Sequence, residues 1–231
     1  MSAARVLVVE DEVRLAQIVG RYLEHDGFTV RLVHDGAQAL MDAATFRPDV
    51  VVLDVMLPGA DGFEVCRALR QTSDCYIVML TAREAERDKL AALALGADDY
   101  VVKPCSPREI LARVRAMLRR PRIETPGPVW PAVAIGPLWI DVEARRVEVN
   151  GQALDLTRTE FDLLHALAAR PAAALTRSEL IRAVWGPGWF GDEHVVDVHV
   201  ANLRRKLSAT PAGAGLIRTV RGIGYGLEDA S

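Results

Sequence analysis

Five residues in the first half of the chain have the chemistry to bind a metal ion and a phosphoryl group. Each ends or directly follows a short apolar run, and in chain order they are Glu10, Asp11, Asp54, Thr81 and Lys103. Carboxylates held about 4 Å apart would repel one another by roughly 4 kcal/mol per pair, so three of them need a cation. Hard oxygen ligands with room for water and a phosphate oxygen suit Mg²⁺. The residue types therefore predict a magnesium site, provided that the fold brings them together.

The lysine and the threonine could complete a site for phosphoryl transfer to a carboxylate. The Lys103 ammonium can pair with Asp54 and later with a phosphoryl oxygen, while the Thr81 hydroxyl can donate to another oxygen. Each residue also has a plain structural role, Lys103 as an ion-pair partner, Thr81 as a strand-end cap and Asp54 as a cap of the loop or of the next helix. Their convergence at one place favours Asp54 as the phosphoacceptor.

The apolar runs before these residues have the pattern of strands that are buried on both faces. The run Val50-Val51-Val52-Leu53 is uninterrupted, whereas a half-exposed strand would alternate. Such runs alternate along the chain with segments of helical spacing. The predicted strands are residues 5–9, 29–33, 50–53, 76–80 and 100–102, and the predicted helices are residues 15–23, 36–45, 61–71, 84–95 and 107–118.

Five β-α units of this length predict an α/β fold with a five-stranded, doubly wound parallel sheet. The carboxyl ends of parallel strands meet at one edge of such a sheet, and ligands bind outside that edge. The five residues named above come from four different strands. The fold itself therefore predicts that they converge.

Composition limits the class of protein. The 231 residues are 50% hydrophobic, enough for two medium domains with real cores. The net charge is −3, with 16 basic and 18 acidic groups in residues 1–120 and 12 and 13 in the rest, so any DNA-binding surface must come from local clustering. No apolar run is long enough for a membrane span, and three cysteines without a pairing pattern indicate reduced thiols. We expect a cytoplasmic protein.

The motifs around the five residues resemble the receiver domain of two-component response regulators. The resemblance covers residues 5–120. Its motifs are Glu10-Asp11, Asp54 with Met56 and Pro58-Gly59, Leu80-Thr81-Ala82-Arg83, and Gly96-Ala97-Asp98-Asp99-Tyr100-Val101-Val102-Lys103-Pro104. It implies that Asp54 accepts a phosphoryl group from a phosphohistidine on a sensor histidine kinase. The Mg²⁺ ligands that it implies are Glu10, Asp11, Asp54 and the carbonyl of Met56. Such a protein is not an ordinary enzyme, although it assists its own phosphoryl transfer and its slow autodephosphorylation.

The same resemblance implies a switch and a dimer. Tyr100 would turn inward once the phosphoryl group draws Thr81 toward itself, and the Lys103-Pro104 peptide would be cis. The phosphorylated protein would form a two-fold homodimer through the fourth helix, fifth strand and fifth helix, with Lys89 facing Glu109, Asp99 facing Arg113, and Asp98 facing Arg120. Without the resemblance these are solvated charges, and exposed pairs contribute only about 0–1 kcal/mol each. One departure from the family pattern is Cys105, which stands where an aromatic residue usually follows the proline.

A proline-rich stretch predicts a linker before a second domain. It runs to about Pro137 without a helical or strand period, and we place the receiver at residues 1–120, the linker at 121–133 and the second domain at 134–231. Alternating segments predict strands at 138–141 and 146–149, with Asn150-Gly151 as the turn into a further strand. Capping boxes at Thr157/Glu160 and Thr176/Glu179 begin two helices, and a third helix spans 193–208.

This third helix and the hairpin after it resemble the winged helix-turn-helix domain of the OmpR/PhoB family, a smaller α+β fold. The match lies in Val196-Asp197-Val198-His199-Val200, Leu203-Arg204-Arg205-Lys206-Leu207 and Thr219-Val220-Arg221-Gly222-Ile223-Gly224-Tyr225, across about residues 134–228. It implies binding of double-stranded promoter DNA, with the helix in the major groove and Arg221 reaching from the wing. Asn202 would meet an adenine edge, Val198 a thymine methyl, and the basic run phosphates. The candidate DNA contacts are His194, Val198, Asn202, Arg204, Arg205, Lys206, Thr219 and Arg221.

Three questions stay open at this point. The loop 186–192, with Trp189 and Phe190, corresponds to the family's RNA polymerase contact region, but its aromatic residues could equally anchor the loop to the domain's own core. A phosphatase of the haloacid dehalogenase type would also use an aspartate with Mg²⁺, although it needs Asp-x-Asp where this chain has Met56. A regulator that binds proteins and not DNA is the third possibility. The leading hypothesis is a transcription regulator that is switched by phosphorylation of Asp54.

Overall fold

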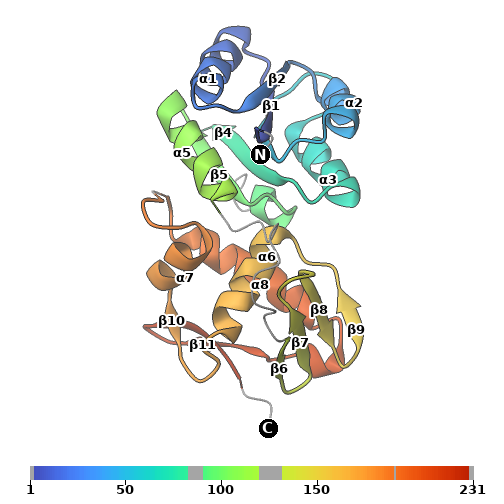
Figure 1. The fold of residues 1–231 in the computed structure, drawn as a ribbon, viewed down its shortest axis with the longest axis vertical. Coiled ribbons are helices and arrows are strands. Elements are labelled where there is room, and N and C mark those ends of the chain that lie inside the picture. Colours follow the sequence, from blue (N-terminus) through green and yellow to red (C-terminus); the bar gives the residue numbers. More distant parts are fainter. Residues whose placement is uncertain (1–2, 83–90, 120–131, 190, 229–231) are drawn as a thin grey trace. The chain divides into compact units, whose positions relative to one another are not determined.

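The structure, a computed structural model, describes residues 3–82, 91–119, 132–189 and 191–228. The chain divides into two compact units, Met1–Arg119 and Arg120–Ser231 (Figure 1). Within the described ranges, no helix is both long enough and apolar enough to cross a lipid bilayer.

The first unit alternates strands and helices, as the sequence predicts. Its elements are β1 Arg5–Val9, α1 Val13–His25, β2 Thr29–Val33, α2 Gly36–Phe46, β3 Val50–Asp54, α3 Gly62–Thr72, β4 Tyr76–Ala82, β5 Asp99–Lys103 and α5 Pro107–Leu118. The helix predicted at 84–95 falls largely outside the described residues, and residues 91–94 are helical.

The five strands form one parallel sheet in the order β2-β1-β3-β4-β5. Helices α1 and α5 pack together on one face, and α2 packs with α3 on the other (Figure 1). All five residues of β3 are buried, because helices cover both sides of the central strand. The predicted doubly wound fold is therefore confirmed, with the change of winding direction between β1 and β3.

Helix α3 begins directly against the end of β3. A Cβ atom at Gly62 would lie 2.1 Å from the backbone oxygen of Asp54, so only glycine allows this approach. Asp61 caps α3, because its side chain accepts from the backbone N–H of Glu64 at 2.8 Å and the Glu64 carboxylate accepts in return from Asp61 N–H. Asp54 is therefore not the cap of the next helix, which was its plain structural alternative.

In its described residues, the second unit has two small antiparallel sheets, three α-helices and one 3-10 helix. Its described elements are β6 Val133–Ile135, β7 Leu138–Asp141, β8 Arg146–Val149, β9 Gln152–Leu154, α6 Arg158–Ala168, β10 Leu175–Thr176, α7 Arg177–Val184, α8 His194–Leu207, the 3-10 helix Pro211–Gly213, β11 Ile217–Val220 and β12 Gly224–Leu227. One sheet has the order β6-β7-β8-β9, and the other has the order β10-β12-β11. Both predicted capping boxes are present, at the start of α6 and at the start of α7.

Two short strands of the second unit, β6 and β10, are not predicted from the sequence. Strand β6 lies in the stretch read as linker, where it pairs with β7 from Val133 opposite Ile140 to Ile135 opposite Leu138. Strand β10 pairs with β12 through two residue pairs. Runs of three and two residues are too short to show a period, and their conformation comes from the neighbouring strand.

Candidate functional site

The register of the parallel sheet brings the predicted chemistry to one edge. Val9 lies opposite Leu53, so the next residues, Glu10 and Asp54, come side by side at the carboxyl ends of β1 and β3. Strand β4 carries Thr81 along the same edge, and Lys103 ends β5. We call this group the carboxyl-edge cluster: Glu10, Asp11, Asp54, Thr81 and Lys103.

Lys103 lies between two buried carboxylates. Its ammonium nitrogen is 2.8 Å from Asp54 Oδ2 and 2.9 and 2.7 Å from the two oxygens of Glu10. The side chains of Glu10 and Asp54 are 1% and 6% exposed, so solvent screens these charges little. The lysine serves as the internal counter-ion of the cluster.

The electrostatic environment keeps that lysine charged. Burial alone would lower the pKa of Lys103, but its hydrogen bonds to Asp54 and Glu10, and the charges of both carboxylates, raise the pKa overall. Burial raises the pKa of Glu10 more than the hydrogen bond from Lys103 lowers it, and the charge of Asp54 raises it further. Two carboxylates therefore share one cation, and a second cation would relieve the excess negative charge.

The donor set fits a hard divalent cation. Carboxylate oxygens of Glu10, Asp11 and Asp54 lie within 4.8 Å of one another, and Asp11 is exposed on the open side of the group. Thr81 is fully buried, and its hydroxyl has no hydrogen-bond partner within the described part of the chain. A buried hydroxyl without a partner costs about 1–3 kcal/mol, so a ligand oxygen at this edge would satisfy a donor that is otherwise unpaired.

Other residues implied by the receiver resemblance lie near the ends of β3 and β5. The Met56 side chain is 73% exposed, while Tyr100 on β5 is 9% exposed. The Lys103-Pro104 peptide is cis, as the resemblance implied. Burial raises the pKa of the Cys105 thiol, and Glu109 raises it further, against a smaller opposite effect of Lys103. Cys105 is therefore not an activated thiolate.

The acidic residues of the predicted dimer face are paired within the chain. Asp98 and Asp99 are each 1% exposed. Arg113 donates to Asp99 at 3.0 Å and to Glu109 at 3.4 Å. Asp98 instead accepts from Arg70 at 2.6 Å and from the backbone N–H of Ile77 at 2.8 Å. The other two predicted interface residues, Lys89 and Arg120, lie outside the described residues.

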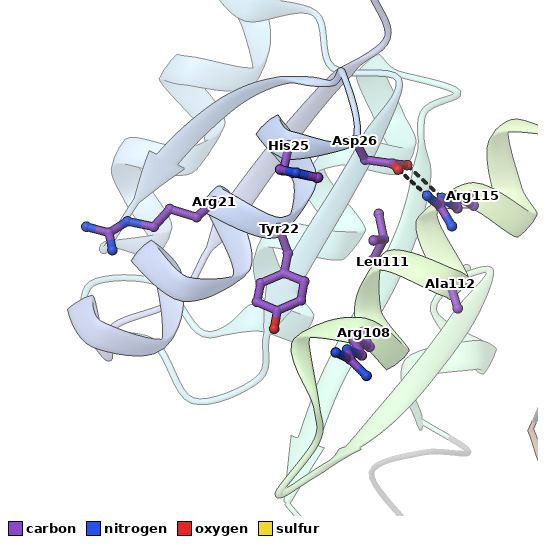
Figure 2. A pocket seen from close by; sticks show the side chains of 8 residues that line it. All are labelled: Arg21, Tyr22, His25, Asp26, Arg108, Leu111, Ala112 and Arg115. Atoms are coloured by element: carbon purple, nitrogen blue, oxygen red, sulfur yellow. Dashed lines mark hydrogen bonds and ion pairs between the residues drawn. The ribbon is translucent and has the colours of Figure 1, made fainter.

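Away from the carboxyl-edge cluster, the first unit has a hollow of about 620 Å³ between α1 and α5 (Figure 2). Tyr22 and Leu111 lie on its two sides, and Arg115 is hydrogen-bonded to Asp26 at its rim (Figure 2). Its lining residues are Arg21, Tyr22, His25, Asp26, Arg108, Leu111, Ala112 and Arg115. None of them belongs to the carboxyl-edge cluster.

Helix α8 presents one exposed face. His194, Ala201 and Arg205 are exposed and Val198 is half-buried, at the spacing of a single helical stripe. The opposite face carries Val196, Val200, Leu203 and Leu207, all at most 1% exposed. The predicted division into a packing face and an outer face is therefore present, with the exception of Asn202, which the sequence analysis placed on the outer face.

Three of the candidate DNA contacts on α8 are engaged inside the domain. Asn202 is 3% exposed, because its position on the helix turns it toward the core and away from the face that a base edge could reach. The Lys206 ammonium is 2.7 Å from the buried carboxylate of Glu160. Arg204 donates at 2.7 Å to the hydroxyl of Thr219, which is itself a candidate contact.

The loop residues and the turn of the hairpin differ in their surroundings. Arg221 is exposed in the turn between β11 and β12, where Gly222 has a φ of 76°. Trp189 lies against the fully buried Trp185, with ring centroids 5.8 Å apart, so this aromatic residue anchors its loop to the domain. Phe190 lies outside the described residues.

A doubly wound receiver sheet with this edge cluster, followed by a winged-helix domain, defines a response regulator with a DNA-binding output domain. Comparisons with known proteins agree. The family described as "Response regulator receiver domain" matches residues 6–115, and "Transcriptional regulatory protein, C terminal" matches residues 151–227.

Relatives match along almost the whole chain. The sensory transduction protein RegX3 of Mycobacterium tuberculosis is 45% identical over 223 residues, covering 96% of this chain and 98% of its own length. The DNA-binding response regulator MtrA of Mycolicibacterium smegmatis is also 45% identical over 223 residues, covering 96% and 95%. The solved structure of response regulator DrrB of Thermotoga maritima, an OmpR/PhoB homologue, has a TM-score of 0.52 at 31% identity and covers 97% and 99%.

The chain belongs to the OmpR/PhoB family of response regulators. Both alternative functions fail on this ground. The first half of the chain matches a response regulator receiver and not a phosphatase, and the second half matches the C-terminal domain of transcriptional regulatory proteins.

Proposed function

We propose that Asp54 is the phosphoacceptor and that a phosphohistidine on a sensor histidine kinase is the donor. In the transfer, the bond between phosphorus and the imidazole nitrogen breaks as a bond forms between phosphorus and an Asp54 carboxylate oxygen. The proposal depends on one observation above all, the Lys103 ammonium 2.8 Å from Asp54 and within 2.9 Å of Glu10. That geometry supplies a fixed positive charge beside the carboxylate where negative charge develops.

We propose Glu10, Asp11, Asp54 and the Met56 carbonyl as the ligands of Mg²⁺. The ion would neutralise phosphoryl oxygens, which is the chemistry that metal ions supply in phosphoryl transfer. Lys103 and the unpaired hydroxyl of Thr81 would bind the remaining phosphoryl oxygens. In this arrangement the same residues also position water for the slow autodephosphorylation.

Substitution of the acceptor tests this assignment. Asp54→Asn should abolish labelling of the full-length chain by radioactive acetyl phosphate in the presence of Mg²⁺. Asp61→Asn is the matched control, because asparagine caps a helix as well as aspartate does, and it should keep the label. Label retained in Asp54→Asn and mapped to another residue would refute the assignment.

The switch that we propose couples the cluster to a dimer face. Movement of Thr81 toward the phosphoryl group would let Tyr100 turn further inward and would rearrange the face formed by the fourth helix, β5 and α5. The interface residues proposed from the family resemblance are Lys89, Asp98, Asp99, Glu109, Arg113 and Arg120. Because the Asp99–Arg113 pair already exists within one chain, a partner subunit would share it and not create it. Single exposed pairs contribute about 0–1 kcal/mol, so the dimer should be weak and dependent on phosphorylation.

In the second domain we propose that the exposed face of α8 enters the major groove of promoter DNA. His194, Val198 and Arg205 are its candidate contacts, and Arg221 would reach from the wing. A gel shift on genomic fragments with the wild-type chain, Arg205→Ala and Arg221→Ala tests this interface. Full binding by both variants would refute it. We also propose that the loop 186–192 contacts RNA polymerase. For the domain bounds we propose a receiver at 1–120 and a linker at 121–133 before the second domain. We propose a cytoplasmic location for the protein.

A further inference from the structure

Helix α8 holds the wing, residues 217–227, at two points. The first is Arg204, which donates to the backbone carbonyl of Ile217 at 3.1 Å and to the Thr219 hydroxyl at 2.7 Å. Ile217 and Thr219 are alternate residues of β11, so one planar guanidinium holds two positions of the outer wing strand. The planar fork of arginine, with donors on separate nitrogens, suits such a two-point contact.

The second point is Asp197, seven residues or about 10.5 Å before Arg204 along α8. Its Oδ1 accepts from the Tyr225 hydroxyl at 2.6 Å and from Arg177 Nε at 2.8 Å. Tyr225 belongs to β12 and lies opposite Thr219 in the strand register. The two points therefore hold both strands of the wing, one strand each.

The Tyr225 ring joins these contacts into one unit. The ring is 6% exposed, and the guanidinium carbons of Arg177 and Arg204 lie 5.3 and 5.4 Å from its centroid. Burial raises the pKa of Tyr225, and the hydrogen bond to Asp197 raises it further. Burial alone would raise the pKa of Asp197, but its hydrogen bonds from Tyr225, Arg177 and His194 lower it overall. The tyrosine therefore stays a donor and the aspartate a charged acceptor.

The wing is also joined to the domain by the buried side chains of Ile217 and Leu227 and by backbone pairing. Strand β12 pairs with β10 at two positions, Leu175 opposite Tyr225 and Thr176 opposite Gly224. Strand β11 is the outer strand of this sheet, which has the order β10-β12-β11. Strand β11 pairs with β12 and not with β10, so Arg204 adds a contact from α8 to the edge strand of this sheet.

We propose that Arg204 is a positioning residue for DNA binding, which fixes the wing against α8 and does not contact a phosphate. The inference rests on the proposed roles of α8 and Arg221 in DNA binding. These two elements must meet one duplex at the same time, so holding them in place before binding reduces the entropy lost on association. The wing takes two of the five N–H donors of Arg204, one on Nε and one on Nη2, so a phosphate contact through the remaining donors is the alternative that the test must distinguish.

Salt dependence separates the two roles. Each phosphate contact contributes about 0.9 to the slope of log K against log salt concentration. The full-length chain, Arg204→Gln and Arg205→Gln are titrated with a double-stranded oligonucleotide that the wild-type chain selects from a random-sequence pool. Arg205→Gln should flatten the slope by about 0.9, as loss of a phosphate contact requires. Arg204→Gln should weaken binding roughly tenfold, equivalent to ~1.4 kcal/mol, with the slope unchanged.

Two further measurements support this test. The first uses a substitution that changes no charge, and the second is made on the protein without DNA. Thr219→Val removes only the hydroxyl and should weaken binding in the same direction, without adding to the loss in Arg204→Gln, because both changes break one contact. Amide hydrogen exchange across residues 217–227, measured on the free protein, should accelerate in Arg204→Gln and not in Arg205→Gln.

An equal flattening of the slope in Arg204→Gln and Arg205→Gln would overturn the proposal, and so would unchanged hydrogen exchange in the wing. If the wild-type chain selects no DNA at all, the proposed DNA-binding interface fails instead. The exchange measurement still decides the positioning role in that case.

Discussion

Thr81 offers a test in which stability and signalling should change in opposite directions. Its side chain is fully buried and its hydroxyl has no partner in the described ranges. An unpaired buried hydroxyl costs about 1–3 kcal/mol, and valine has nearly the same shape without it. Thr81→Val should therefore raise the free energy of unfolding of the receiver by about 1 kcal/mol, the lower end of that cost.

The chain contains a matched control for the same substitution. Thr210 is also buried, at 5% exposure, but its hydroxyl donates to the Leu207 carbonyl at 3.0 Å and accepts from Gly213 N–H at 3.1 Å. Thr210→Val removes both of these hydrogen bonds, while the backbone bonds from Thr210 N–H to the Leu207 carbonyl and from Gly213 N–H to the Thr210 carbonyl remain. It should destabilise the second unit by about 0.5–1.5 kcal/mol. All four tryptophans lie beyond residue 129, so tryptophan fluorescence during urea unfolding reports on the second unit. Circular dichroism reports on both units, so the difference between the two unfolding curves gives the unfolding of the receiver.

The signalling half of the test uses beryllofluoride, which stands in for the phosphoryl group on Asp54. Sedimentation of the wild-type chain with Mg²⁺ and beryllofluoride should show a dimer, whereas Thr81→Val should stay monomeric because no hydroxyl draws the switch inward. A receiver destabilised as much as the Thr210→Val control would show that the Thr81 hydroxyl does have a partner. A normal beryllofluoride-induced dimer in Thr81→Val would refute its role in the switch.

Two further predictions concern Lys103 and His165. Lys103→Ala should still permit slow labelling of Asp54 by acetyl phosphate. It should form no beryllofluoride-induced dimer in sedimentation, because the ammonium serves the switch as well as the transfer. A normal dimer in this variant would contradict the prediction. Burial lowers the pKa of His165 more than the charge of Asp162 raises it, and Arg145 lowers it further. The stability of the second unit should therefore be fully present above the ordinary histidine pKa of about 6.5 and decrease as the pH falls through the lowered value. Tryptophan fluorescence should show this loss in urea midpoint in the wild-type chain and a smaller loss in His165→Asn, and equal losses would refute it.

Much of the receiver could be predicted because its local signals agree with its tertiary structure. Buried parallel strands are continuous apolar runs, so β3 and its terminal Asp54 were visible in the sequence. In the second domain, capping boxes such as Thr157 with Glu160 predicted the helix starts, because residues at this three-residue spacing form the capping hydrogen bonds themselves. The carboxyl-edge cluster followed from topology alone, since parallel strands share one carboxyl edge.

The remaining contacts depend on which elements pack together, which one sequence does not show. A helical pattern placed Asn202 and Lys206 on the basic side of α8, but Asn202 is turned into the core and Lys206 pairs with Glu160 on α6. Arg70 was overlooked for the same reason, because its partner Asp98 is 28 residues away. Lys206 and Glu160 are 46 residues apart, and no local signal joins such pairs.

The carboxyl-edge cluster has a consequence for protein synthesis, because its members are distributed from residue 10 to residue 103. A nascent chain that has left the ribosome only through β4 carries Asp54 but still lacks the Lys103 ammonium. Under the proposed function, full competence to receive a phosphoryl group would arise only when the last sheet strand has been translated and added, so incomplete polypeptides would take phosphate only slowly.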